Sequence, residues 1–146
     1  MKICIIGYSG SGKSELADKL SRFYQIPVLH LDNFKDRKEQ EEMIHHFIKN
    51  ENWIVDGNHY DLHDKRFELC DEIYFLDYNR FYCYIECFRR FLQNFEFQKW
   101  ILTEQREQKI KDEHYSHLIL FGKRKYHFKN KIQLRKHLNT LKKDSD

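Results

Sequence analysis

The residues best suited to chemistry form a phosphate-binding pattern near the start of the chain. Residues 7–14 read GYSGSGKS, a full match to G-x-x-x-x-G-K-[ST]. The glycines allow backbone N–H groups to turn toward a polyanion, which a Cβ would obstruct. Lys13 has the reach to contact the β- and γ-phosphates, and the Ser14 hydroxyl can bind Mg²⁺. The candidate nucleotide-binding residues are Gly7, Tyr8, Ser9, Gly10, Ser11, Gly12, Lys13 and Ser14.

The flanks of this pattern support the same interpretation. An apolar run at residues 2–6 precedes it, and a helix-like segment at residues 15–23 follows it. A strand, a glycine loop and a helix N-terminus together make a phosphate cradle. The alternative is a plain surface turn between a strand and a helix. The eight-residue match and both flanks favour the cradle, so the sequence predicts binding of a nucleoside triphosphate.

Polar residues also follow three other apolar runs. They are Asp32, the Asp56-Gly57-Asn58 triplet and residues 77–80. In an open parallel sheet the ligand sits outside the carboxyl ends of the strands, so one crevice could gather all of them. Two alternatives stay open at this point. Asp32 also suits a helix N-cap, and Asp56-Gly57-Asn58 is also a strong turn signal.

Five arginines are candidates for binding phosphate oxygens. Arg80, Arg89 and Arg90 fall on the helix expected after the fourth strand, and Arg106 falls on the next one. The planar guanidinium group suits phosphate oxygens. Arg37 lies in a charged run at residues 35–39 and could anchor an acceptor phosphate. A solvated surface position is the alternative for each of these side chains.

These residues are positioned by elements that alternate along the chain. Apolar periodicity predicts strands at 2–6, 27–31, 52–56, 71–77 and 126–128, and helices at 13–24, 39–50, 61–69, 79–94, 98–120 and 132–141. The alternation predicts an α/β protein with a five-stranded parallel sheet and helices on both faces, a three-layer arrangement. The tail at residues 142–146 is expected to fray.

Length and composition set further bounds. The 146 residues fit one domain spanning 1–146, and no apolar run reaches 18 residues, so no membrane span is expected. The chain enters a strand directly, without a signal peptide, which favours the cytoplasm. The four cysteines form no C-x-x-C pair and the nine histidines show no zinc spacing, so reduced thiols are expected.

The net charge of +3 is unevenly distributed. Residues 116–146 contain nine Lys or Arg and two acidic residues, a net charge of +7, which leaves −4 for residues 1–115. Such a basic end can contact nucleic acid, but a solvated helix face is the favoured interpretation. An adenine base is expected against the helix after the fourth strand and the loop near Lys123 and Arg124.

Four segments together resemble a known family. IIGYSGSGKS at 5–14, PVLHLD at 27–32, WIVDGN at 53–58, and IYFLD at 73–77 followed by Arg80 are similar to the bacterial FlaR-like proteins, labelled DNA topology modulation proteins. The resemblance covers roughly residues 1–110. That family is similar to the adenylate kinase and shikimate kinase branch of P-loop proteins. It implies a P-loop kinase fold with strand order 2-3-1-4-5 and a short, mobile lid carrying arginines.

The resemblance also implies roles for individual residues, with ATP and Mg²⁺ as cofactors. Lys13, Asp32, Asp56, Arg89 and Arg90 would be catalytic, and Ser14 and Asp56 would hold the metal. Asp32 would face the acceptor, and Gly57 would let the acceptor approach the backbone. The residues expected to bind substrate are Asp32, Arg37, Gly57, Asn58, Arg80 and Arg106. Glu15 replaces a frequent Thr, and the segments after Asp32 and after Arg90 are short, which affects the acceptor site.

Three functions are compatible with this set of residues. The favoured one is an ATP- and Mg²⁺-dependent phosphotransferase that acts on an unidentified small-molecule acceptor. The second is a regulatory nucleotide switch: no N-K-x-D guanine motif is present, but Asp56 or Asp77 could serve as the acid after an apolar run. The third, a nucleic-acid-associated protein, lacks any recognised DNA-reading module. No membrane partner is expected, and the sequence leaves the oligomeric state open.

Overall fold

A five-stranded, all-parallel sheet forms the centre of the computed structural model, which describes residues 1–58, 60, 65–90, 95–103 and 106–145. The strand order is β2-β3-β1-β4-β5, which confirms the predicted order 2-3-1-4-5. The strands are β1 (Lys2–Gly7), β2 (Val28–His30), β3 (Trp53–Asp56), β4 (Glu72–Leu76) and β5 (Arg124–Phe128).

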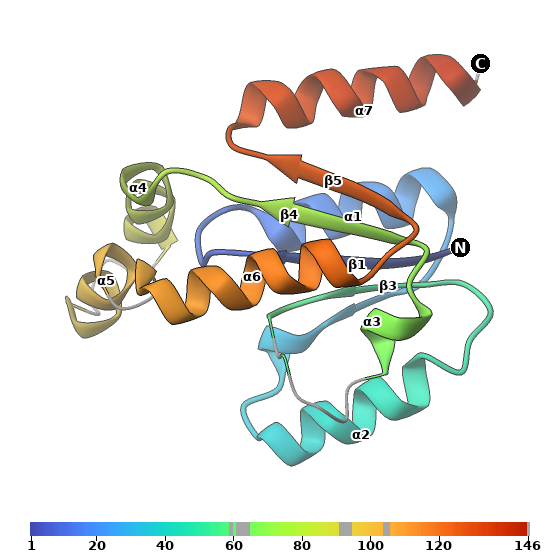
Figure 1. Cartoon of the computed structure of the whole chain (residues 1–146), viewed down its shortest axis with the longest axis horizontal. Coiled ribbons are helices and arrows are strands. Elements are labelled where there is room, and N and C mark those ends of the chain that lie inside the picture. Colours follow the sequence, from blue (N-terminus) through green and yellow to red (C-terminus); the bar gives the residue numbers. More distant parts are fainter. Residues whose placement is uncertain (59, 61–64, 91–94, 104–105, 146) are drawn as a thin grey trace.

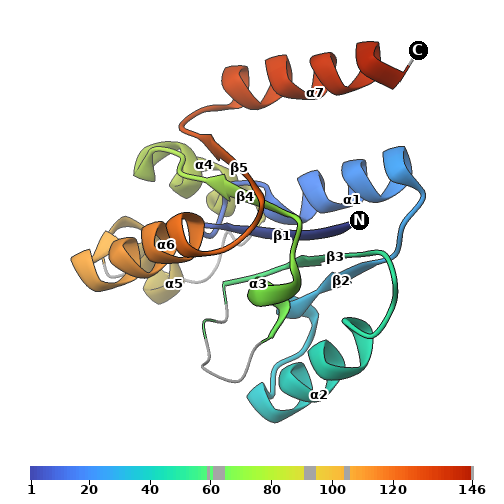
Figure 2. The same ribbon diagram turned by 45° about the vertical axis from the view of Figure 1, so that its right-hand side comes forward.

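Helices cover both faces of this sheet, as predicted. They are α1 (Lys13–Tyr24), α2 (Arg37–Phe47), α3 (Arg66–Leu69), α4 (Arg80–Arg90), α5 (Phe95–Leu102), α6 (Gln108–Leu120) and α7 (Lys131–Ser145), with a 3₁₀ turn at Leu31–Asn33. Helices α1 and α7 lie on one face, and α2, α3 and α6 lie on the other (Figures 1 and 2). Helices α4 and α5 lie beyond the carboxyl ends of the strands, next to the edge where a ligand is expected (Figure 1).

The strands are near-continuous apolar runs because both of their faces are covered. Residues 3–7 and 72–76 are all buried, and the Trp53 side chain is fully buried at the start of β3. Side chains alternate between the faces, so Ile5 shares the α1 face with its ladder partners Asp56 and Tyr74. This register decides which polar groups meet at the carboxyl ends of the strands.

Several helix boundaries differ from the predicted ones. The predicted helix 98–120 is two helices, α5 and α6, and a turn separates them in which the Arg106 N–H donates to Thr103 O at 2.9 Å. Of the predicted helix 61–69 only α3 is described, because residues 61–64 lie outside the described part of the chain. The end of the predicted helix 79–94 likewise lies outside it, because residues 91–94 are not described. Helix α7 continues to Ser145, so the expected fraying from residue 142 is wrong.

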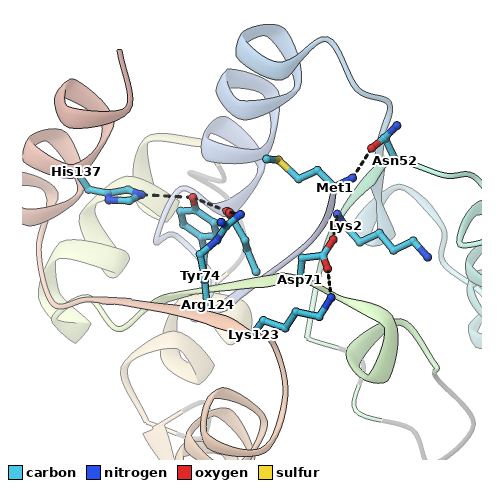
Figure 3. Close-up of polar contacts among 9 residues, drawn as sticks. Met1, Lys2, Asn52, Asp71, Tyr74, Lys123, Arg124 and His137 are labelled. Atoms are coloured by element: carbon cyan, nitrogen blue, oxygen red, sulfur yellow. Dashed lines mark hydrogen bonds and ion pairs between the residues drawn. The ribbon is translucent and has the colours of Figure 1, made fainter. Parts of the chain in front are cut away.

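The opposite edge of the sheet, where the strands begin, is held by polar contacts (Figure 3). Asp71 accepts hydrogen bonds from the Lys2 N–H at 3.0 Å and from Lys123 Nζ at 2.8 Å. Arg124 pairs with the buried Glu72. Lys123 and Arg124 therefore lie at the amino end of β5, and the expectation that adenine lies near them is wrong. Parallel pairing places the loop after β5, not the loop before it, beside the phosphate loop.

Within the residues described, none of the helices combines the length and the apolar character that crossing a membrane requires.

Candidate functional site

The phosphate loop joins β1 to α1 and is packed tightly against α4. Gly10 adopts φ +80°, and a Cβ at this position would lie 2.3 Å from Cys83 O and 2.7 Å from Cys87 Sγ. Only glycine avoids both the backbone strain and the clash. The loop is thus held by close packing of Gly10 against Cys83 and Cys87 of α4.

Lys13 is the first residue of α1 and is only 7% exposed. Its Nζ donates a hydrogen bond to Tyr8 O at 3.2 Å, so the ammonium group lies against the loop. The Ser11 N–H also donates to Tyr8 O, at 3.1 Å. Ser11 Oγ is buried and has no partner among the described residues. A lysine charge, an unsatisfied hydroxyl and a helix N-terminus at one place make a cradle that suits a phosphate chain.

Asp56 is the last residue of β3 and is completely buried on the α1 face. Its Oδ2 accepts a hydrogen bond from His30 Nδ1, and His30 Nε2 lies 3.0 Å from Asp18 Oδ1 on α1. Burial lowers the pKa of His30, but hydrogen bonds and charges from Asp56 and Asp18 outweigh it and raise the pKa above its ordinary value. Asp56 Oδ1 has no partner among the described residues.

This arrangement can be tested for its fit to Mg²⁺. Magnesium keeps several waters and is usually held by one or two carboxylates together with substrate phosphates. Ser14 at the start of α1 and the uncommitted Oδ1 of Asp56 are oxygen donors of the right kind. The described residues contain no cluster of three or more His, Cys, Asp or Glu that would hold a metal alone. A metal here would therefore need further ligands, such as the phosphates of a nucleotide bound at the loop.

Asp32 follows β2 in the 3₁₀ turn and is exposed. The turn is fixed by Gln40, whose Nε2 donates to Leu31 O at 3.1 Å and to Phe34 O at 2.7 Å. The Asp32 carboxylate has no hydrogen-bond or ion-pair partner in the described part of the chain. It is thus an unpaired acid on an ordered turn at the carboxyl edge of the sheet.

Gly57 and Asn58 have structural contacts that the sequence did not reveal. Asn58 Nδ2 donates to Gly7 O at 2.6 Å, and the Gly7 N–H donates to Asn58 Oδ1 at 3.0 Å. Asn58 therefore ties the end of β3 to the start of the phosphate loop. A Cβ on Gly57 would lie 2.8 Å from Leu31 Cβ, so the close approach at this glycine is to the turn that carries Asp32.

Arg106 is the predicted arginine that the structure brings to the phosphate loop. Its guanidinium carbon lies 3.6 Å from the centroid of the Tyr8 ring. Its Nη2 donates to Tyr78 O at 2.8 Å and lies 3.3 Å from Cys83 Sγ. This cation–π contact joins the segment before α6 to the loop and places a positive charge beside it.

Arg37, Arg80 and Arg89 lie on exposed helix surfaces. Arg89 pairs with Glu86 at 3.3 Å, and Arg37 Nε lies 4.0 Å from Glu41 Oε1. Arg80 begins α4 and is exposed. The side chain of Arg90 lies outside the described residues. The roles of these arginines in phosphate binding stay predictions.

In the part of the chain that the structure describes, a cavity borders the phosphate loop on each face of the sheet. The first, about 170 Å³, lies on the α1 and α7 side; its lining is Ser11, Gly12, Glu15, Leu16, Lys19, Tyr78, Lys131, Leu134, Arg135 and Leu138. The second, about 210 Å³, lies on the α5 and α6 side; its lining is Tyr8, Asn58, Tyr60, Trp100, Ile110, Glu113 and His114. We call the second the aromatic cavity. A loop between two cavities is suited to a reaction with two substrates.

Sequence reasoning missed Tyr60, Glu113 and His114 as lining residues and gave Trp100 no role in the site. His114 is only 1% exposed, and a hydrogen bond joins its Nδ1 and the Tyr60 hydroxyl. Burial and the positive charge of Lys13 lower the pKa of His114 to about 3, so its imidazole is neutral at pH 7. The sequence did contain a signal for His114: it stands four residues after Ile110 and four before Leu118, and therefore on the same apolar helix face.

Comparisons with known proteins agree with this geometry at the level of the fold. No protein-family model matches the chain, and no curated protein matches its sequence. A shikimate kinase from Bacteroides thetaiotaomicron superposes with a TM-score of 0.69 and 16% identity, over 98% of this chain and 97% of that one. A deoxyadenosine kinase from M. mycoides, with products bound, superposes with a TM-score of 0.58 and 16% identity, over 98% and 100%. A shikimate kinase from Aquifex aeolicus gives a TM-score of 0.55 and 18% identity, over 99% and 98%. The chain is therefore similar in fold to small P-loop kinases.

Proposed function

We propose that this protein is an ATP- and Mg²⁺-dependent phosphotransferase that acts on a small-molecule acceptor. The observation that carries the proposal is the phosphate loop with a cavity on each side of it. ATP would place its triphosphate along the loop and its base toward the cavity lined by Tyr78 and Lys131. The acceptor would occupy the aromatic cavity. A relation to the FlaR-like proteins, which rests on sequence motifs, is part of the proposal.

Different residues at the loop would bind different parts of the triphosphate and its metal ion. The Lys13 ammonium would leave Tyr8 O and contact the β- and γ-phosphate oxygens. The backbone N–H groups at the start of α1 would hold the remaining charge. Ser14 and Asp56 Oδ1 would hold Mg²⁺, directly or through water, and the ion would supply positive charge that offsets the charge of the bound phosphates. His30 would fix the Asp56 carboxylate through its other oxygen.

The reaction is an in-line transfer to a hydroxyl group. The acceptor oxygen forms a bond to the γ-phosphorus while the bond from that phosphorus to the β–γ bridging oxygen breaks, giving ADP and a phosphorylated acceptor. The hydroxyl proton passes to a carboxylate, a role that we give to the unpaired Asp32. Arg106, and Arg80, Arg89 and Arg90 after a closing movement, would stabilise charge on the transferring group. Arg37, Gly57 and Asn58 would border the acceptor.

Transfer of labelled phosphate from γ-³²P ATP tests this proposal, with Lys13→Ala as the variant. Loss of one electrostatic contact to a developing charge commonly costs 10²- to 10³-fold in rate, so we expect a loss of about that size. The matched control is Lys49→Ala, an exposed lysine remote from the loop in sequence. Circular dichroism checks that both variants keep the fold. A Lys13→Ala rate near that of wild type contradicts the proposal.

A further inference from the structure

We propose that the acceptor is a nucleoside whose base carries an exocyclic amino group, and that the aromatic cavity binds this base. The inference deepens the proposed function and rests on it, because it names the chemical class of the acceptor. It is carried by the rings of Tyr8, Tyr60 and Trp100 together with the carboxylate of Glu113, all of which line one cavity beside the phosphate loop.

The rings of this cavity are held in place by their neighbours. The Arg106 guanidinium carbon lies 3.6 Å from the centroid of the Tyr8 ring, and the His114 ring packs against Tyr8 at 4.8 Å and 88°. Tyr60 is fixed by its hydrogen bond to His114 and by a ring contact with Phe67 at 5.8 Å. A rigid, mostly aromatic lining favours a flat aromatic occupant, since little side-chain entropy is lost when such an occupant binds.

The size of the cavity restricts the occupant further. Its volume is about 210 Å³. Sites for drug-sized ligands occupy about 300–1,000 Å³, so this cavity suits one small ring system rather than a larger molecule. Tyr8 is at once a wall of the cavity and a residue of the phosphate loop. A base bound here therefore brings the hydroxyls of its attached sugar toward the loop, where phosphoryl transfer would occur.

The charge of the lining selects the chemistry of the base. Glu113 lines the cavity, and its carboxylate has no hydrogen-bond or ion-pair partner among the described side chains. An ionised carboxylate only accepts hydrogen bonds, so it favours a ligand with N–H donors. His114 adds no positive charge because burial and the nearby Lys13 lower its pKa to about 3.

The same lining disfavours an anionic acceptor such as a sugar acid. The described lining contains no lysine or arginine. Lys13 and Arg106 lie next to the cavity, but Lys13 Nζ is bonded to Tyr8 O and Arg106 is stacked on the Tyr8 ring. An acidic occupant would meet the Glu113 carboxylate, and placing two like charges together in a buried site is unfavourable.

Matched ligand pairs test the inference without ATP or turnover. Cytidine and uridine differ at the exocyclic position of the ring and at N3, and adenosine and inosine differ at the exocyclic position and at N1. Calorimetric titration of the wild-type protein should show that at least one amino-bearing member binds tenfold or more tightly than its oxo partner, since N–H donation to Glu113 is lost in the latter. This comparison needs no variant and so does not depend on the folding of one.

Variants then assign the preference to named side chains. Glu113→Gln should narrow the preference for the amino-bearing nucleoside to within about threefold, because an amide both donates and accepts. The control Asp112→Asn removes the same charge from the neighbouring, exposed position, where Asp112 bonds Gln108, and should leave the preference unchanged. Trp100→Ala should weaken binding about tenfold or more, while Trp100→Phe retains stacking and most of the affinity.

The outcomes separate this inference from the proposed function. Equal affinity within both ligand pairs, or no nucleoside binding at all, overturns the inference. Label transfer from ATP to a hydroxy acid but not to a nucleoside also overturns it and leaves the phosphotransferase proposal standing. Glu113-dependent nucleoside binding without any transfer from ATP supports the cavity assignment and contradicts the proposed function.

Discussion

The buried His114 should make the protein sensitive to acid by a predictable amount. Its side chain is 1% exposed, and burial together with the charge of Lys13 lowers its pKa to about 3. In the unfolded chain a histidine titrates near pH 6.5. Between these values the unfolded chain binds one more proton than the folded protein, so the free energy of unfolding falls as the pH falls. From pH 7.5 to pH 5 this histidine should remove about 2 kcal/mol of stability.

A second histidine acts with the opposite sign and must be separated from the first. Hydrogen bonds to Asp56 and Asp18 raise the pKa of His30 even though burial opposes this. The stability that His30 contributes is fully present below pH 6.5 and is lost as the pH rises through its folded value. Acidification therefore strengthens the contribution of His30 while it weakens that of His114. Burial also lowers the pKa of His137, so the wild-type profile reports the sum of several groups and a His114 variant is needed to isolate one of them.

The assay is urea unfolding at pH 7.5 and pH 5, followed by tryptophan fluorescence from the buried Trp53. His114→Gln lacks the titrating group, so the loss of stability between the two pH values should be about 2 kcal/mol smaller in this variant than in wild type. His46→Gln, at an exposed position on α2, serves as the control and should leave the wild-type difference unchanged. An identical pH dependence in wild type and His114→Gln would refute the reasoning.

Three further predictions concern the loop and the acceptor side. Gly10→Ala should destabilise the protein by about 1–2 kcal/mol or more, because φ is +80° and the new Cβ would lie 2.3 Å from Cys83 O. The variant should also bind ATP more weakly in a titration. An affinity for ATP equal to that of wild type would contradict the packing described. Asp32→Asn should lower kcat about 10²-fold, since the lost interaction forms mainly in the transition state. The affinity for ATP should stay within about threefold of the wild-type value. An unchanged kcat would exclude Asp32 as the base. ATP and GTP should bind within about tenfold of each other, because no base-specific motif is present; a hundredfold preference would show a selective base pocket.

The fold could be predicted well because each strand and the phosphate loop is marked by residues that are contiguous in the sequence. Each strand is a short apolar run, and the phosphate loop is a contiguous motif, so their order along the chain gives the architecture. The boundary between α5 and α6 was not predicted, because residues 98–120 read as one helical segment and the turn near Thr103 has no proline or glycine to mark it. The start of β5 was predicted two residues late because charged side chains at Arg124 and Lys125 hide the strand pattern.

The site was predicted less completely because its contacts join distant segments. The link from Asp18 through His30 to Asp56 depends on the register in which His30 stands opposite Asp56, and a sequence does not reveal register. The aromatic cavity joins Tyr8 to Tyr60 and to three residues of α6, all more than 50 positions away. In contrast, Lys13 and Ser14 were predicted because they stand within the loop motif itself.

The fate of the γ-phosphate tests the central claim most directly. The wild-type protein is incubated with γ-³²P ATP, Mg²⁺ and a panel of nucleosides and hydroxy acids, and the label is divided between organic product and inorganic phosphate. If the protein is a phosphotransferase, most of the label should appear on one acceptor, and this transfer should be lost in Lys13→Ala. Release of the label only as inorganic phosphate, at the same rate with and without every acceptor, would contradict the account and favour a nucleotide switch.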